Sequence, residues 1–383
     1  MNSKISIKNG YNVFVKNNNE IEIRSGAWSS PVITIVDDKK LGKLEDIVSK
    51  FNGNYNTNEI IQLIGIEYKD IIRSLIYELS QRGILDTFNI AISPIRSYFS
   101  IYSNSLDLIC NSLKNATIFV VGSGLLGSKI STNLSFFGIK KLILLDNSRI
   151  ENIHTSYSPY FSKKDIDKFL GSHVSNMIKQ INEKIEIEYI NYDMHNDLNN
   201  VDKLMSSSQL TVVCPDYPVP KIWSKVNNMA IENNFIWTIA TIDGYDGQIG
   251  PTFIPFETAC YKCLELRINN NITNHQYNMR YKQIMLNESK SIQQNHLGIP
   301  GIVDIVTGFL TLDVPNIITT KTGYTIGKLI LINYRSPEFE THSLLKLPRC
   351  SECGKTYRGW STNAFYTSLN SILDDRNTSI KNE

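Results

Sequence analysis

The fold is constrained most by a regular alternation of apolar strand-like runs and helix-like segments from Ala116 onward. The runs ATIFVV, KKLILLD, IEIEYI, QLTVVC and FIWTIAT are typical of strands, and segments with helical spacing of apolar residues separate them. This β-α-β alternation predicts an α/β fold with a doubly wound parallel sheet of the Rossmann type. A chain of 383 residues, of which 42% are hydrophobic, is long enough to hold a second domain as well.

A glycine-spaced turn, GSGLLG, follows the first of these strands and opens the next helix. Gly122, Gly124 and Gly127 fit the G-x-G-x-x-G pattern, in which glycines let the backbone approach a phosphate at a helix N-terminus. The same glycines also fit a plain strand-to-helix turn that serves packing alone. Asp146 ends the second strand, where an acidic residue commonly accepts hydrogen bonds from ribose hydroxyls. The pattern predicts a nucleotide-type fold and leaves the ligand open.

The first 90 residues follow a different pattern. Three strand-like runs, YNVFVK, EIEIR and PVITIVD, precede three helical segments, LGKLEDIVSKF, TNEIIQLI and YKDIIRSLIYELSQRG. This order predicts a small winged-helix domain over residues 1–90, a linker and first helix over 91–115, and the α/β domain over 116–383. Winged helices often bind DNA, but the third helix carries few cations and the net charge of the chain is only +2. We therefore expect no nucleic acid as a partner.

Neither a signal sequence nor a membrane span is expected. The N-terminus, MNSKISIKNG, lacks a hydrophobic signal core, and the longest apolar runs are too short to cross a bilayer. We expect a cytoplasmic protein without a membrane partner. In that reducing compartment the six cysteines would not form disulfides.

Four of the six cysteines form two CxxC pairs, Cys260 with Cys263 and Cys350 with Cys353. Each CxxC turn directs two thiolates at one centre, so two turns complete a tetrahedral S₄ shell for Zn²⁺. A closed shell leaves no open coordination position, which predicts a structural zinc that clips the C-terminal segment onto the middle of the chain. The alternative is a pair of redox-active motifs or incidental thiols.

The order of these motifs resembles that of the E1-like ThiF family of adenylating proteins, which activate ubiquitin-like or peptide C-termini with ATP. The resemblance covers Arg96 to Cys353 and rests on GSGLLG, LILLDNSRIEN, VVCPDYP, GQIGPTFIPFETACYKC and CSECG. The chain is most similar to the peptide-modifying branch, in which a winged-helix leader-binding domain, the RiPP recognition element, precedes the E1-like domain. This branch includes enzymes of the microcin C type and the E1-like partners of azole- and thiopeptide-forming YcaO cyclodehydratases. For Asp216 the resemblance implies a magnesium ligand, although this carboxylate could instead cap the helix after Pro218.

Two family elements that bring positive charge to ATP are replaced in this chain. Where the family has S/T-N-L-x-R-Q, the chain has IHTSYS, so Tyr157 stands in place of the arginine. Where the family has D-I-G-K-x-K, Lys168 aligns with the first lysine, and the second lysine falls on Leu170, or on Val174 if a gap lies earlier. Neither a phenol nor an aliphatic side chain stabilises charge that develops on phosphates. We therefore expect no ATP or magnesium chemistry, no catalytic residue, and a degenerate nucleotide site at Gly122, Gly124, Gly127, Asp146 and Asp216.

The resemblance then implies two functions. The first is a scaffold, not catalytic by itself, that binds the leader of a ribosomal precursor peptide and presents it to a YcaO cyclodehydratase, with a flavin dehydrogenase as a further candidate partner. The alternative is an ATP-dependent enzyme that adenylates a peptide C-terminus or side chain. The resemblance also implies a homodimer, for which IVDIVTGFLTLDVPNI is either an interface element or plain core. An NAD-dependent dehydrogenase is disfavoured, because neither the acidic loop nor the Cys₄ clip belongs to its usual anatomy.

The leader peptide is expected to bind by β-augmentation, as an extra strand on the edge of the small N-terminal sheet. The run SPVITIVD is the candidate edge, because it has high β-propensity and directly precedes the helices. The third helix would offer the facing pocket, although its apolar residues could equally be ordinary core. The predicted peptide-binding residues are Val32, Thr34, Val36, Tyr68, Ile71 and Leu75.

Overall fold

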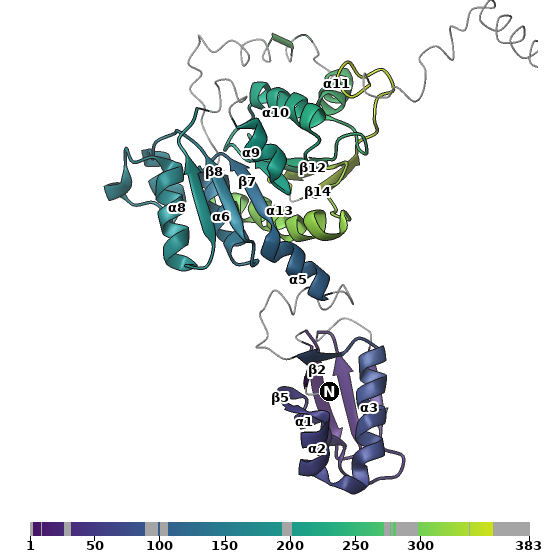
Figure 1. The fold of residues 1–383 in the computed structure, drawn as a ribbon. Coiled ribbons are helices and arrows are strands. Elements are labelled where there is room, and N and C mark those ends of the chain that lie inside the picture. The colour runs from purple at the N-terminus through teal and green to yellow at the C-terminus, as the bar shows by residue number, and fades with distance from the viewer. Residues whose placement is uncertain are drawn as a thin grey trace, which may run out of the picture. The chain divides into compact units, whose positions relative to one another are not determined.

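The computed structural model describes residues 3–8, 10–26, 32–88, 106–193, 201–271, 298–336 and 338–354, with a few isolated positions between them (Figure 1). The chain divides into two compact units, residues 1–111 and 112–383. Most of the predicted linker over 91–115 lies outside the described residues.

The N-terminal unit contains two small antiparallel sheets and three α-helices. The sheets have the strand orders β2-β3-β4 and β5-β1-β6. The elements are β1 (Lys4–Ile7), β2 (Asn12–Asn17), β3 (Glu20–Arg24), β4 (Val32–Val36), α1 (Leu44–Ser49), β5 (Asn52–Asn56), α2 (Thr57–Ile64), α3 (Lys69–Gln81) and β6 (Leu85–Phe88), with a 3₁₀ turn at Ile66–Tyr68 before α3. The three predicted strands, β2 to β4, and the three predicted helices are confirmed; β1, β5 and β6 add a second sheet that the sequence pattern does not reveal. The winged-helix classification stays a prediction.

The core of this unit forms between the β2-β3-β4 sheet and the helices. Ile21 and Ile23 of β3 are fully buried, and they pack in one cluster with Ile47 of α1, Ile60 of α2 and Ile72 of α3. The alternation of β3 places its glutamates and arginine on the opposite face.

The second unit is built on an eight-stranded sheet with the order β14-β13-β12-β11-β10-β7-β8-β9. Five strands are parallel and confirm the predicted doubly wound sheet, whereas β12, β13 and β14 extend it in antiparallel fashion. The strands are β7 (Thr117–Val121), β8 (Lys141–Leu145), β9 (Glu186–Ile190), β10 (Leu210–Val213), β11 (Trp237–Asp243), β12 (Asp246–Phe253), β13 (Lys328–Asn333) and β14 (Glu338–Ser343).

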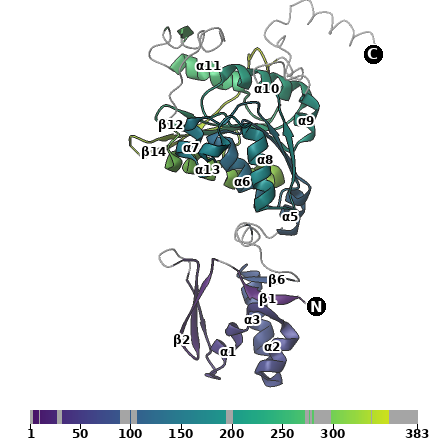
Figure 2. The same ribbon diagram turned by 90° about the vertical axis from the view of Figure 1, so that its left-hand side faces the viewer.

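Helices cover both faces of this sheet (Figures 1 and 2). One face carries α9 (Asp202–Ser207), α10 (Pro220–Asn233) and α11 (Tyr261–Asn271), which share an apolar core with the strands. The other face carries α6 (Leu125–Ser135), α8 (Leu170–Ile181) and α13 (Pro300–Thr320). The short helices α5 (Leu106–Asn115) and α7 (Asn152–Tyr157) precede β7 and follow β8. The carboxyl ends of β7, β8 and β10 therefore meet at one edge of the sheet, where ligands of such folds bind.

One helix among the described residues, α13, is long and apolar enough to cross a membrane. This corrects the expectation that every apolar segment is too short. Half of its most apolar stretch is buried inside the unit, as in a core helix.

Candidate functional site

The glycine turn joins β7 to α6 at the carboxyl edge of the sheet. Gly122 has a φ of 98°, a conformation that side chains rarely adopt. A Cβ on Gly127 would lie 2.0 Å from the carbonyl oxygen of Gly122, and a Cβ on Gly124 would lie 2.1 Å from Oδ2 of Asp216. Contacts within the protein therefore account for all three glycines.

Asp146 follows β8 and faces the same turn. Its Oδ2 accepts a hydrogen bond from the N–H of Ser123 at 2.6 Å, and its Oδ1 accepts one from the N–H of Ser148 at 2.7 Å. The side chain is almost fully buried, and this burial raises the pKa of the carboxyl group. Asp146 thus ties the turn to the loop after β8.

Asp216 follows β10 and binds the N-terminus of α6. Its two oxygens accept hydrogen bonds from the N–H groups of Leu125, at 2.8 Å, and Leu126, at 2.9 Å. This corrects the expectation that Asp216 could cap the helix after Pro218: that helix, α10, has no side-chain cap, and Asp216 caps α6 instead. A phosphate bound by a helix of this kind would occupy the place that the carboxylate takes.

A pocket of about 270 Å³ opens beside these groups. Three carboxylates line it, those of Asp146, Glu151 and Asp216, whereas Arg149 is the one lysine or arginine among the described lining residues. The Arg149 guanidinium donates a hydrogen bond to the carbonyl of Asp167 and lies 4.4 Å from the ring centroid of Phe169. The three carboxylates, after burial itself, raise the pKa of the neighbouring Tyr217. The electrostatic field in the pocket is therefore mainly negative.

The positions at which the family carries its phosphate-binding cations bring no charge to this pocket. Tyr157 is partly exposed and is not among the lining residues. Leu170 lines the pocket with an aliphatic side chain, and Val174 is buried in α8. Lys168 points elsewhere, because its Nζ bonds Oδ1 of Asp165 at 2.8 Å.

His154, the second residue of the IHTSYS stretch, also lines the pocket, although it is not among the predicted site residues. Its Nδ1 accepts a hydrogen bond from the N–H of Glu151 at 2.9 Å, and its Nε2 lies 4.0 Å from Oδ2 of Asp216. Because Nδ1 is the acceptor, the neutral ring carries its proton on Nε2, on the side of Asp216. No local pattern in the sequence indicates this juxtaposition of residues 62 positions apart.

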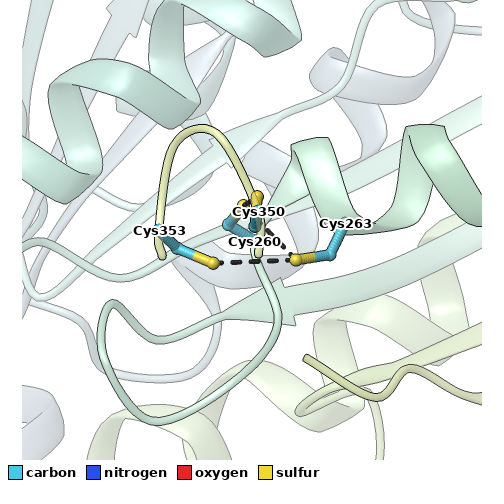
Figure 3. A group of neighbouring side chains, drawn as sticks. All are labelled: Cys260, Cys263, Cys350 and Cys353. Carbon is cyan, nitrogen blue, oxygen red and sulfur yellow. Dashed lines mark hydrogen bonds between the residues drawn. The ribbon is translucent and has the colours of Figure 1, made fainter. Parts of the chain in front are cut away.

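The four cysteines of the CxxC pairs meet in one buried cluster (Figure 3). The Sγ atoms of Cys260 and Cys263 are 3.8 Å apart, and those of Cys350 and Cys353 lie 3.6 Å from Cys260 and Cys263 respectively. Zinc–sulfur bonds of 2.3 Å in a tetrahedron place sulfurs about 3.8 Å apart, so the cluster has the size of a zinc–thiolate shell. The hydrogen bond with Cys263 raises the pKa of Cys260, because the thiols of the cluster share protons in the absence of a cation. These cysteines could hold a structural zinc ion.

A groove of about 820 Å³ lies in the N-terminal unit, between β4 and α3. Of the six predicted peptide-binding residues, all but Val32 border it: Thr34, Val36, Tyr68, Ile71 and Leu75. Leu41, Leu44 and Ile47 complete its apolar lining from the side of α1.

The side chains of β4 alternate between two faces, which the prediction did not take into account. Ile33 and Ile35 pack on the core of the unit. Thr34 and Val36 lie on the outer face, opposite Glu22 and Glu20 of the neighbouring strand β3. Thr34 and Val36 therefore border the groove at the edge of β4, while Ile33 and Ile35 lie on the side of the core. The period-two pattern of the strand, read against the buried isoleucines of β3, could have given this assignment.

The fold and the turn at its switch point define an E1-like α/β protein. The family model described as "ThiF family" matches residues 101–354, more than half of the chain, and the chain belongs to this family. Among curated relatives, the adenylyltransferase and sulfurtransferase MOCS3 of Caenorhabditis briggsae is 22% identical over 63% of this chain and 56% of its own length. Protein HesA of Trichormus variabilis is 23% identical over 67% of this chain and 88% of its own length.

Solved structures show the same fold. Escherichia coli MccB with AMPCPP and MccA superposes with a TM-score of 0.66 and 19% identity over 92% of this chain and 100% of that one. PaaA superposes with a TM-score of 0.61 and 15% identity over 89% of this chain and all of its own. At 19% and 15% identity, these matches show that the fold is shared.

Proposed function

We propose that this chain binds an extended segment of a ribosomal precursor peptide in the groove between β4 and α3, and that its ThiF domain acts on the bound peptide. The groove supports the first part of the proposal. Family membership, and the solved structures in which MccB holds MccA, support the second.

The groove is the observation that carries peptide binding. Strand β4 is the outer strand of its sheet, so within the described residues one edge of its backbone is unpaired. Across the groove, Ile71 is 36% exposed, which is too much for an ordinary core residue. An added strand would gain main-chain hydrogen bonds along β4 and cover Ile71, Leu75 and Tyr68.

Adenylation is the reaction that the family supports. A carboxylate oxygen of the peptide attacks the α-phosphorus of ATP, and pyrophosphate leaves. In this chain the turn at Gly122 would border the nucleotide, Asp146 would face the ribose, and Asp216 would hold magnesium while it keeps its place on the N-terminus of α6. Both Asp216 oxygens already accept a helix N–H, so magnesium would use their remaining lone pairs.

A second candidate, a scaffold that does not adenylate, is favoured by the charges of the pocket. Three carboxylates and one arginine line it, and the two family cations are replaced by Tyr157 and by Leu170 or Val174. Transfer of an adenylyl group from ATP builds negative charge on the leaving pyrophosphate, and positive charge nearby must stabilise it. Under this candidate, a YcaO cyclodehydratase, with or without a flavin dehydrogenase, would supply the chemistry.

Exchange of labelled pyrophosphate into ATP separates the two candidates. The assay uses the purified full chain and synthetic peptides made from the short reading frames that flank its gene. Peptide-dependent exchange that falls at least tenfold in Asp216→Ala supports adenylation. Absence of exchange supports the scaffold if the peptide binds with micromolar affinity and Ile71→Ser removes binding while Leu63→Ser, an exposed position outside the groove, does not. Absence of both exchange and binding would overturn the proposed function.

A further inference from the structure

Within its five residues, strand β4 lacks the charges, prolines and bulges that normally protect the edge of a sheet, and Asp37 and Asp38 follow it directly. Its sequence, VITIV, contains no charge and no proline, and its pairing with β3 is regular, without a bulge. Val32 and Val36 are 42% and 56% exposed. Exposed edge strands usually carry charges, prolines or bulges, because a flat apolar edge recruits other strands. This edge is therefore suited to being covered.

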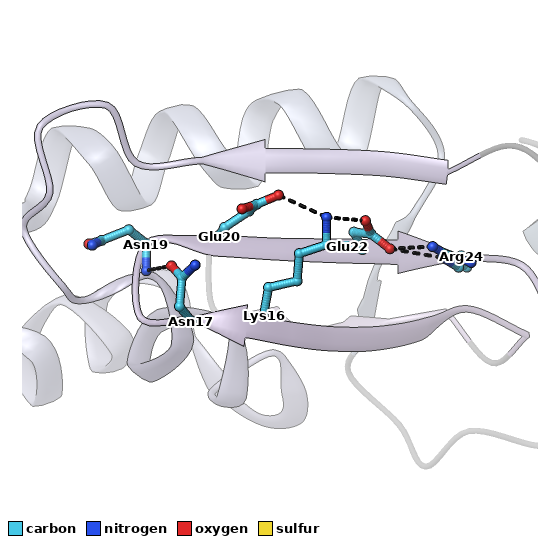
Figure 4. A network of polar contacts seen from close by, with 6 residues as sticks. All are labelled: Lys16, Asn17, Asn19, Glu20, Glu22 and Arg24. Carbon is cyan, nitrogen blue, oxygen red and sulfur yellow. Dashed lines mark hydrogen bonds and ion pairs between the residues drawn. The ribbon is translucent and has the colours of Figure 1, made fainter.

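By the alternation of β4, the side chains of the exposed valines lie on the face of the sheet opposite Ile33 and Ile35, and Val36 also borders the groove at the strand edge. Arg24 lies opposite Val32 and Glu20 lies opposite Val36, on the outer face that Figure 4 shows with the helices behind it. Packing on the core does not account for these two side chains, because Ile33 and Ile35 supply that packing.

Ion pairs on the outer face neutralise the charges next to β4 (Figure 4). Nζ of Lys16 lies 2.9 Å from Glu20 and 2.5 Å from Glu22, and Arg24 bonds the other oxygen of Glu22 at 2.5 Å. The negative charges of Glu20 and Glu22, which lie opposite β4 residues, are thus neutralised by cations of the same sheet. A strand added to β4 would meet Val32, Thr34 and Val36 on this face, and no uncompensated charge from the neighbouring strand.

We propose that the peptide docked on β4 is recognised on both of its faces. This inference rests on the proposed function and extends it. Every second side chain of the peptide enters the groove beside Ile71 and Leu75. The side chains between them pack on Val32 and Val36, with Cβ atoms about 4.5–5.5 Å apart, as for directly opposite residues of paired strands. The ligand is therefore an extended segment with apolar residues at consecutive positions, not an alternating apolar and charged one.

A second copy of the chain is the competing occupant. VITIV reads the same in both directions, so antiparallel self-pairing would set Val32 of one copy opposite Val36 of the other. The twofold axis of such a pair is perpendicular to the sheet, and it would bring the α3 helices of both copies to the same face at the shared edge. Because α3 already forms the far wall of the groove, a single strand fits this edge better than a second copy does.

Selection from a phage-displayed library of random 12-residue peptides tests the proposal on the full chain. Peptides enriched on the wild type should carry a run of apolar residues at consecutive positions. On the double variant Val32→Thr and Val36→Thr, the preference at one set of alternate positions should disappear while that at the other set stays. The control variant Leu63→Ser, which alters an exposed apolar residue outside the groove, should select the same peptides as the wild type.

Binding of one enriched synthetic peptide, followed by fluorescence anisotropy, should weaken about two- to thirtyfold in the double valine variant. An alternating pattern on the wild type, or an unchanged pattern on the valine variant, would overturn recognition on the outer face while leaving the groove intact. Enrichment that does not respond to Ile71→Ser, or no enrichment at all, would overturn the proposed function with it. A doubled mass in light scattering that the valine variant alone abolishes would identify a second copy as the occupant and refute the proposal.

Discussion

Replacing Cys350 by serine should release the C-terminal segment from α11. Cys350 and Cys353 are buried against Cys260 and Cys263, and Leu344 and Leu347 pack on this cluster while remaining partly exposed. Burying a leucine fully stabilises a protein by about 1.5–3 kcal/mol, so two half-buried leucines account for about 2 kcal/mol in addition to the metal bonds. In a unit of this size, that loss lowers the melting temperature by roughly 4–8 °C.

Metal analysis and calorimetry check this prediction together. The wild type should contain one equivalent of zinc, and Cys350→Ser should contain far less and melt earlier. Hydrogen exchange should speed up in residues 344–354 and in the first turn of α11. Cys110→Ser is the matched control, because Cys110 lies outside the cluster and should change neither zinc content nor melting. Wild-type protein with well under one equivalent of zinc, or an unchanged Cys350→Ser variant, would refute the metal clip.

Three further predictions follow from charge and exposure. Without magnesium, ATP should bind no tighter than about 1 mM, because the pocket is mainly negative; calorimetry in EDTA that shows micromolar binding would contradict this field argument. The exposed α13 residues Ile305, Phe309 and Leu312 should support a homodimer, so light scattering should give twice 43.6 kDa and Phe309→Ser should give the monomer mass. Hydrogen bonds from Lys168 and then Ser162 lower the pKa of Asp165, so its contribution to stability is present at neutral pH and is lost as the pH falls below about 4. Asp165→Asn should therefore melt earlier than the wild type at pH 7, and this difference should shrink at pH 3.

The sequence predicts those parts of the fold that depend on local periodicity. Apolar runs give the five parallel strands, and the CxxC spacing gives the four cysteines that meet in Figure 3. Local periodicity does not predict contacts between residues that are distant in the sequence. Asp216, for example, accepts a hydrogen bond from the N–H of Leu125, 91 positions away. Which side chains of β4 face the core is only partly predictable. The alternation of the strand is visible in the sequence, but the choice of face depends on which face of β3 the helices cover.

The glycine turn shows why a motif alone does not identify a nucleotide site. Gly124 is required here by a carboxylate of the protein itself, since a Cβ would collide with Asp216 on the N-terminus of α6. A helix N-terminus satisfies its free N–H groups equally well with an internal carboxylate or with a phosphate. The turn geometry is thus common to both situations, and the surrounding charge distinguishes them. A triphosphate needs cations around it. Among the described lining residues, Arg149 is the one lysine or arginine, against three carboxylates. Any adenylation by this chain must bring its missing positive charge from magnesium, from a partner, or from residues outside this pocket lining.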